Sequence, residues 1–89
     1  MVKIEVFTSP TCVYCPYALD IVTKVASKFK NVSVEEVDIS DPIGRIRAIS
    51  YGIDVTPTIV VDGIVRFVGV PDPTELARVC EQELKKRKK

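Results

Sequence analysis

Hydrophobic residues in the first third of the chain change from a short continuous run to a helical period. The run from Val2 to Phe7 is rich in β-branched and aromatic residues and stops at Ser9-Pro10, which predicts a strand. The next segment predicts an amphipathic helix with Pro16 in its first turn and one face on a sheet. Its apolar residues recur three and four positions apart: Ala18, Ile21, Val22, Val25, Ala26 and Phe29.

A second strand and a second helix follow. The segment from Val32 to Ile39 alternates in character, and the pair Glu35-Glu36 interrupts the alternation, which predicts a strand at a sheet edge. Asp41-Pro42 then predicts the start of a helix that stops at about Gly52. The apolar positions expected to face the core from this helix are Ile46, Ile49 and Ile53.

The last third of the chain contains a hairpin signal. Two apolar runs, Thr58 to Val61 and Ile64 to Val68, are separated by Asp62-Gly63, a pair that favours a two-residue type I′ turn. A loop from Gly69 to Pro73 leads to a last helix that starts at Asp72 or Thr74. The residues expected on its apolar face are Leu76, Val79, Cys80 and Leu84.

This order of elements predicts an α/β fold with the sequence βαβαββα. The first strand-helix-strand unit implies a right-handed crossover and a parallel strand pair, to which the hairpin adds antiparallel strands. The expected architecture is a four-stranded mixed sheet flanked by three helices. With 89 residues, the chain is expected to form one domain over residues 1–89, with a single core and no large internal substrate cavity.

Composition and charge narrow the class of protein. Hydrophobic residues make up 46% and charged residues 28%, values typical of a globular protein. Five of the thirteen basic residues lie at 85–89, so the rest of the chain has eight basic and twelve acidic residues. An acidic body argues against a nucleic-acid-binding domain, and the basic tail is interpreted as a solvated helix end. Without a long apolar run or a secretion signal, a cytoplasmic protein with no membrane partner is expected.

The segment Cys12-Val13-Tyr14-Cys15 is the strongest chemical signal. It lies at the predicted start of the first helix, where unpaired N–H groups and a partial positive charge stabilise a thiolate at Cys12. The spacing keeps Cys15 within disulfide reach, so one thiol attacks and the other releases. Two small core residues or half of a metal site are the alternatives. The chain has no histidine, which excludes histidine-assisted nucleophilic catalysis.

These features resemble the thioredoxin and glutaredoxin family over nearly the whole chain. The matching features are, in order, Thr11-Cys12-Val13-Tyr14-Cys15 after the first strand, Thr56-Pro57 before the third, the Asp62-Gly63 hairpin, and Gly69 after the fourth. The resemblance implies a thioredoxin fold and a thiol-disulfide oxidoreductase.

The same resemblance assigns roles to residues. It implies that Cys12 is the attacking thiolate, Cys15 the resolving thiol, and the Cys12–Cys15 disulfide the redox centre, with no cofactor and no metal. The Thr56–Pro57 bond is expected to be cis and to lie against the dithiol. Substrate contacts are expected from Thr56, Pro57, Tyr14, Thr11 and Gly69, with an extended peptide pairing beside Thr56.

The sequence combines features of the two branches of the family. Pro10-Thr11, Tyr14 and the absence of tryptophan resemble glutaredoxins. Glutaredoxins usually have a basic residue where this chain has Ser9 and a second glycine where it has Val70, so glutathione is expected to be a poor partner. Thioredoxins usually place a buried acid where this chain has Val6, so no proton relay is expected from that position.

The mixed pattern resembles the small glutaredoxin-like thioredoxins of prokaryotes. The expected partners are disulfide-containing proteins and a thioredoxin-type reductase, and the expected state is a monomer. Two alternatives stay open: a glutathione-dependent glutaredoxin, and a metal or iron-sulfur carrier that uses the same two thiolates. Cys80 is expected to be a buried inert thiol, with a regulatory role as the alternative, and Tyr17 is expected to pack on the sheet. Tyr51 and Phe67 are interpreted as core or rim aromatics.

Overall fold

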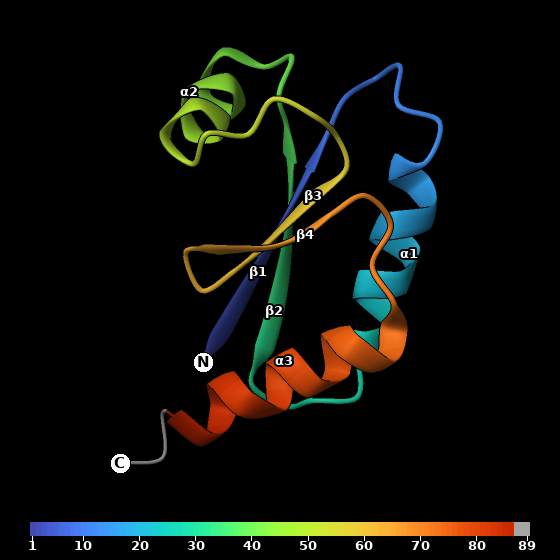
Figure 1. Ribbon diagram of the computed structural model, residues 1–89, viewed down its shortest axis with the longest axis vertical. Coiled ribbons are helices and arrows are strands. Elements are labelled where there is room, and N and C mark those ends of the chain that lie inside the picture. Colours follow the sequence, from blue (N-terminus) through green and yellow to red (C-terminus); the bar gives the residue numbers. More distant parts are fainter. Residues whose placement is uncertain (87–89) are drawn as a thin grey trace.

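The computed structural model describes residues 1–86 and contains four strands and three helices (Figure 1). In chain order the elements are β1 (Val2–Thr8), α1 (Cys15–Ala26), β2 (Val32–Asp38), α2 (Pro42–Ser50), β3 (Thr58–Val61), β4 (Ile64–Val68) and α3 (Pro73–Lys86). The predicted order is confirmed. Of the basic tail, Lys85 and Lys86 belong to α3, and positions 87–89 lie outside the described residues.

The strands form one mixed sheet in the order β2-β1-β3-β4. Strand β1 is parallel to β2 and antiparallel to β3, and β3 is antiparallel to β4. The edge position predicted for the second strand is therefore confirmed. In the hairpin between β3 and β4, Asp62 and Gly63 have φ angles of 49° and 82°. Positive φ at both central residues is what a type I′ turn requires.

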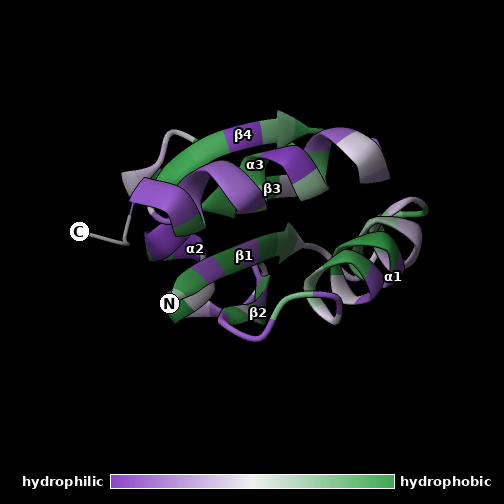
Figure 2. Ribbon diagram, turned by 90° about the horizontal axis from the view of Figure 1, so that it is seen from below, coloured by the Kyte–Doolittle hydropathy of each residue, from purple (hydrophilic) through white to green (hydrophobic). Residues whose placement is uncertain are grey.

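Each face of the sheet has its own hydrophobic cluster. Val2, Ile4 and Val6 of β1 are fully buried on the face covered by α1 and α3. Phe7 lies on the other face with residues of β2, α2 and β3. Figure 2 shows the hydrophobic colouring along most of β1 and the mixed colouring of α3, whose apolar side is buried. The apolar faces predicted for the first and last helices are thus confirmed.

The ends of α2 follow the predicted signals. The Asp41 side chain accepts hydrogen bonds from the backbone N–H groups of Ile43 and Gly44, at 3.1 and 3.2 Å. At the other end Gly52 has a φ of 71°, and the N–H of Ile53 donates to the carbonyl of Ala48 at 2.9 Å. A positive-φ glycine with this hydrogen bond satisfies carbonyls left free at a helix end.

The face that α2 turns to the sheet differs from the prediction. Ile46 and Ile49 are 67% and 66% exposed, whereas Gly44 and Ala48 are buried. A Cβ atom at position 44 would lie 2.0 Å from the carbonyl oxygen of Asp38, so the helix packs too closely for a large side chain there. The prediction of an isoleucine core face was therefore wrong, except that Ile53, beyond the helix, is partly buried.

Candidate functional site

The two cysteines of the Cys12-Val13-Tyr14-Cys15 segment lie between β1 and α1. The backbone N–H of Cys12 donates to the carbonyl of Ser9 at 3.2 Å, so Cys12 lies in a turn. Helix α1 starts at Cys15 with Tyr14 as its N-cap, which corrects the prediction that both thiols lie at the helix start. Pro16 follows in the first turn, where backbone N–H groups have no partner within the helix, so its missing N–H costs no hydrogen bond.

Cys12 and Cys15 form a disulfide, with their Cα atoms 5.4 Å apart. They differ in exposure: Cys15 is 4% exposed, and Cys12 is partly exposed. Both line a hollow of about 200 Å³ between the β1–α1 loop, α1 and β2. An incoming disulfide therefore has access to the sulfur of Cys12 and much less access to that of Cys15.

Residues far along the chain are hydrogen-bonded to the loop that carries Cys12. The peptide bond between Thr56 and Pro57 is cis. The hydroxyl groups of Ser9 and Thr56 are hydrogen-bonded at 3.3 Å, which ties the segment before β3 to the loop that carries Cys12. The N–H of Gly69 donates to the carbonyl of Pro57 at 2.8 Å, and Gly69 has a φ of 97°. The structure thus connects Thr56, Pro57 and Gly69 to the dithiol loop.

Two tyrosines close to Cys12 in the chain are exposed. Tyr14 and Tyr17 are 64% and 63% exposed, and their ring centroids are 6.5 Å apart. The prediction that Tyr17 packs on the sheet was wrong, because Cys15 and Ala18 occupy the inward side of this turn. Thr11 is exposed in the preceding turn. The site therefore offers flat rings and a hydroxyl group to a partner.

Sequence reasoning missed Glu36 as a residue of the site. The Thr8 hydroxyl donates a hydrogen bond of 3.0 Å to the Glu36 carboxylate, and both residues line the hollow that contains Cys12 and Cys15. In the sequence, the Glu35-Glu36 pair indicates only an edge strand. The alternation of side chains along a strand could have found Glu36. Val6 and Thr8 point to one face of β1, and Glu36, the partner of Val6 in the parallel strand β2, points to the same face.

The third cysteine lies away from this site. Cys80 is fully buried on α3, and burial, with a smaller effect of the Asp62 and Glu81 carboxylates, raises the pKa of its thiol. Asp62 follows the last residue of β3, whereas Pro57 precedes its first residue, so Cys80 and the dithiol lie toward opposite ends of that strand. Within residues 1–86, no three or more His, Cys, Asp or Glu side chains are grouped to hold a metal ion. No helix in this range is long and apolar enough to cross a membrane.

Comparisons with known proteins agree with the geometry. A family model described as a thioredoxin domain matches residues 2–81. A probable thioredoxin of Methanothermobacter marburgensis is 45% identical over 85 residues, which cover 94% of this chain and 98% of that protein. A thioredoxin of Methanocaldococcus jannaschii is 39% identical over 84 residues, covering 93% and 96% of the two chains.

Solved structures show the same fold. A mutant thioredoxin from Halobacterium salinarum has a TM-score of 0.76 and 25% identity, and the match covers 91% of this chain and 73% of that one. Thioredoxin 1 of Thermosipho africanus has a TM-score of 0.77 and 21% identity, with 98% and 99% of the two chains covered. At 21% identity, the second likeness concerns the fold alone.

Proposed function

This chain belongs to the thioredoxin family and is a thiol-disulfide oxidoreductase, and we propose that it reduces the disulfides of other proteins. In this proposal Cys12 is the attacking thiolate and Cys15 is the resolving thiol. The observation that carries the assignment is the difference in exposure between a partly exposed Cys12 and a buried Cys15. Only the more exposed sulfur is open to a disulfide on a folded partner.

The exchange proceeds through a mixed disulfide. The thiolate of Cys12 attacks one sulfur of the substrate disulfide, forms a bond to it and expels the other sulfur as a thiolate. Cys15 then attacks the sulfur of Cys12, which forms the Cys12–Cys15 disulfide and releases the second substrate sulfur. The substrate gains two electrons and the dithiol loses two. The positive end of α1 stabilises negative charge in the turn that precedes it.

We propose that the substrate binds across the two connected loops. Thr56, Pro57 and Gly69 form one side, and Thr11 and Tyr14 form the other. An extended peptide that pairs with the backbone beside Thr56 would place its cysteine near Cys12, in the manner of an added strand. The exposed ring of Tyr14 supplies apolar contact area without loss of much side-chain freedom.

The electron donor is proposed to be a thioredoxin-type reductase rather than glutathione. Substrate and reductase both react through the sulfur of Cys12, so the two partners must bind in turn. We further propose that the protein works as a monomer in the cytoplasm, where a dithiol is kept reduced. Gel filtration tests the monomer, and activity with each purified reductase tests the donor.

Cysteine variants test the assignment of roles. We expect Cys15→Ser to accumulate a mixed disulfide between Cys12 and a protein substrate such as insulin, visible on non-reducing gels and by mass spectrometry. Cys12→Ser should lose insulin reduction, and Cys80→Ser, altered at a buried site elsewhere, should keep it. Trapping of substrate by Cys12→Ser through Cys15 would reverse the roles of the two thiols.

A further inference from the structure

The hollow beside the dithiol has one carboxylate in its wall. Apart from the two cysteine sulfurs, Glu36 is the only acidic or basic group among the described residues that line it. From this arrangement we propose that Glu36 accepts the proton of Cys15 in the step that resolves the mixed disulfide. The proposal rests on the function proposed above and adds a further residue to its chemistry.

The strand pairing directs Glu36 toward the dithiol. Glu36 in β2 is the register partner of Val6 in β1, and parallel partners place their side chains on the same face of the sheet. Val6 belongs to the cluster under α1, the helix that starts with Cys15. The Thr8 hydroxyl holds one carboxylate oxygen of Glu36 at 3.0 Å. The Glu36 side chain is exposed, and its carboxylate is held by Thr8 on the face of the sheet that α1 covers.

Among the described residues, no cation pairs with Glu36. The neighbouring carboxylates of Glu5 and Glu35 both bind Arg47, and Glu35 also binds Lys3 at 2.9 Å. No ion pair within residues 1–86 includes Glu36. In the part of the chain that the structure describes, no cation therefore competes with a proton for the Glu36 carboxylate.

Other charged groups near Glu36 are already engaged. A second hollow, between β2 and α2, is bordered by Glu36 and four charged residues, which are Glu35, Asp38, Asp41 and Arg47. Asp38 accepts hydrogen bonds from Ser40, and Asp41 caps α2. On α1, Asp20 and Lys24 are exposed and pair with each other at 3.1 Å. Glu36 is therefore the group placed to exchange a proton with the dithiol.

The resolving step needs such an acceptor. Cys15 is buried in the disulfide form of the protein, and once reduced it attacks a disulfide only as the thiolate. The proton passes from the sulfur of Cys15 to the carboxylate of Glu36, directly or through one water. The new thiolate then bonds to the sulfur of Cys12, and the bond between Cys12 and the substrate sulfur breaks. The departing substrate thiolate takes up a proton from Glu36 or from solvent.

A two-phase assay separates this step from the first attack. In a Cys80→Ser background, reduced protein in excess reacts with the chromogenic disulfide dithiobis(nitrobenzoate). Attack by Cys12 releases the first coloured thiolate, and attack by Cys15 on the mixed disulfide releases the second. For Glu36→Gln we expect an unchanged first phase and a second phase slower by at least about tenfold at about pH 6. The difference in second-phase rate between Glu36→Gln and wild type should disappear by about pH 9, where solvent removes the proton of Cys15.

Matched variants make the outcome decisive. Glu35→Gln changes the adjacent carboxylate, whose partners Arg47 and Lys3 lie away from the hollow, and should leave both phases unchanged. Glu36→Asp should recover part of the second phase. A second phase of Glu36→Gln that is unaltered, or slowed equally at every pH, would overturn the proposal. A wild-type reaction that begins at Cys15 would instead contradict the proposed function itself.

Discussion

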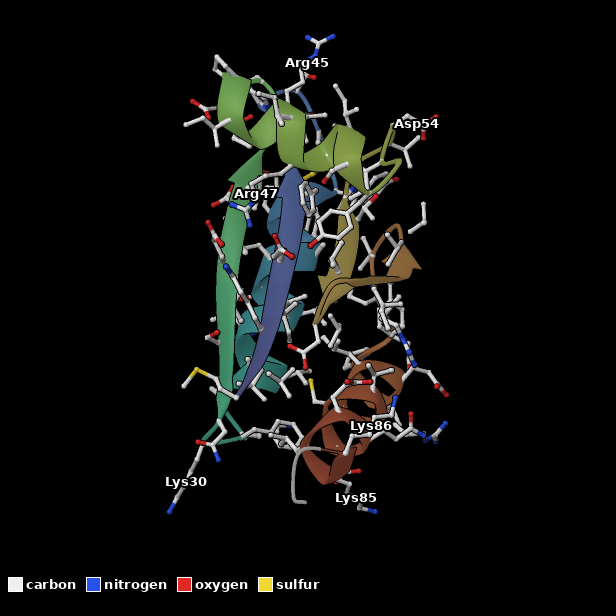
Figure 3. All side chains as sticks on the ribbon, turned by 90° about the vertical axis from the view of Figure 1, so that its left-hand side faces the viewer. Lys30, Arg45, Arg47, Asp54, Lys85 and Lys86 are labelled. Carbon is white, nitrogen blue, oxygen red and sulfur yellow. A yellow bond between two sulfur atoms is a disulfide. The ribbon has the colours of Figure 1, made fainter. Side chains whose placement is uncertain are left out.

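Arg47 of α2 binds Glu5, a residue in the middle of β1 with only 6% of its surface exposed. The Tyr51 hydroxyl donates to the same carboxylate at 3.0 Å, and the Tyr51 ring packs edge-on against Phe7. Arg47 also binds Glu35 of β2 with two hydrogen bonds, at 2.9 and 3.1 Å. Figure 3 shows Arg47 directed toward the strands and Arg45 directed away from them. A network of charged side chains thus joins α2 to β1 and to the edge strand β2.

We expect Arg47→Met to lower the free energy of unfolding by about 2–3 kcal/mol. Removal of one partner from a buried pair typically costs about 3–5 kcal/mol, because the other charge is left without compensation. The expected loss of stability is smaller here because the Arg47 side chain is 31% exposed, so solvent screens part of the interaction. Urea unfolding measures the change, and Arg45→Met on the same helix is the control, expected within about 0.5 kcal/mol of wild type. Equal stabilities of the two variants would contradict a structural role for the network.

Glu35 makes part of the stability depend on acid pH. Hydrogen bonds from Arg47 and Lys3 lower the pKa of the Glu35 carboxyl from 4.5 to about 2. A lowered folded-state pKa gives stability that is present above the unfolded pKa and is lost as pH falls through the folded pKa. Because 42% of the Glu35 side chain is exposed, solvent reduces the contribution to about 1 kcal/mol. Urea midpoints of wild type and Glu35→Gln should therefore converge between about pH 4.5 and pH 2; a constant difference would contradict this.

Gly44 sets the distance between α2 and β2. We expect Gly44→Ala to destabilise the protein by at least about 1 kcal/mol, because the new methyl group would meet the backbone of Asp38. The higher helix propensity of alanine, worth about 1 kcal/mol, acts in the opposite direction and offsets part of this cost. Thermal and urea unfolding measure the balance, with the exposed neighbour Ile43→Ala as the control. A more stable Gly44→Ala protein would show that α2 can move outward freely.

The pattern of apolar residues predicted the elements well and the packing of α2 poorly. A period of three and four residues identifies a helix, but it assigns the core face to the largest apolar side chains. In α2 the inward positions are Gly44 and Ala48, whose small size permits close packing on β2. Arg47 is turned toward the strands because Glu5, 42 positions earlier in the chain, neutralises it. No local pattern contains that pairing.

The site was predictable in part. The spacing and the position before a helix indicate Cys12 and Cys15 as a redox pair, the resemblance adds the Thr56-Pro57 pair, and the structure adds the hydrogen bond between Ser9 and Thr56 that joins the two loops. Glu36 was not predicted, because its place beside the dithiol depends on the register between two strands separated by a helix. A local sequence pattern does not show which residues come together only when distant strands pair.

Glutathione is expected to be a poor electron donor, and two positions account for it. Ser9 has no charge to bind a glutathione carboxylate, and its hydroxyl is used in the hydrogen bond to Thr56. Val70, which is 43% exposed, adds a side chain beside Gly69 where a second glycine would leave backbone N–H groups open to an anion.

Turnover coupled to glutathione and its reductase tests this expectation. The double variant Ser9→Lys with Val70→Gly should raise that turnover by about tenfold, which corresponds to about 1.4 kcal/mol of added binding in the transition state. Ser9→Ala with Val70→Ala is the matched control, since it removes the same hydrogen bond and shortens the same side chain without adding a cation or a glycine. Efficient turnover of the unmodified protein with glutathione would contradict the argument, because Ser9 and Val70 would then be no obstacle.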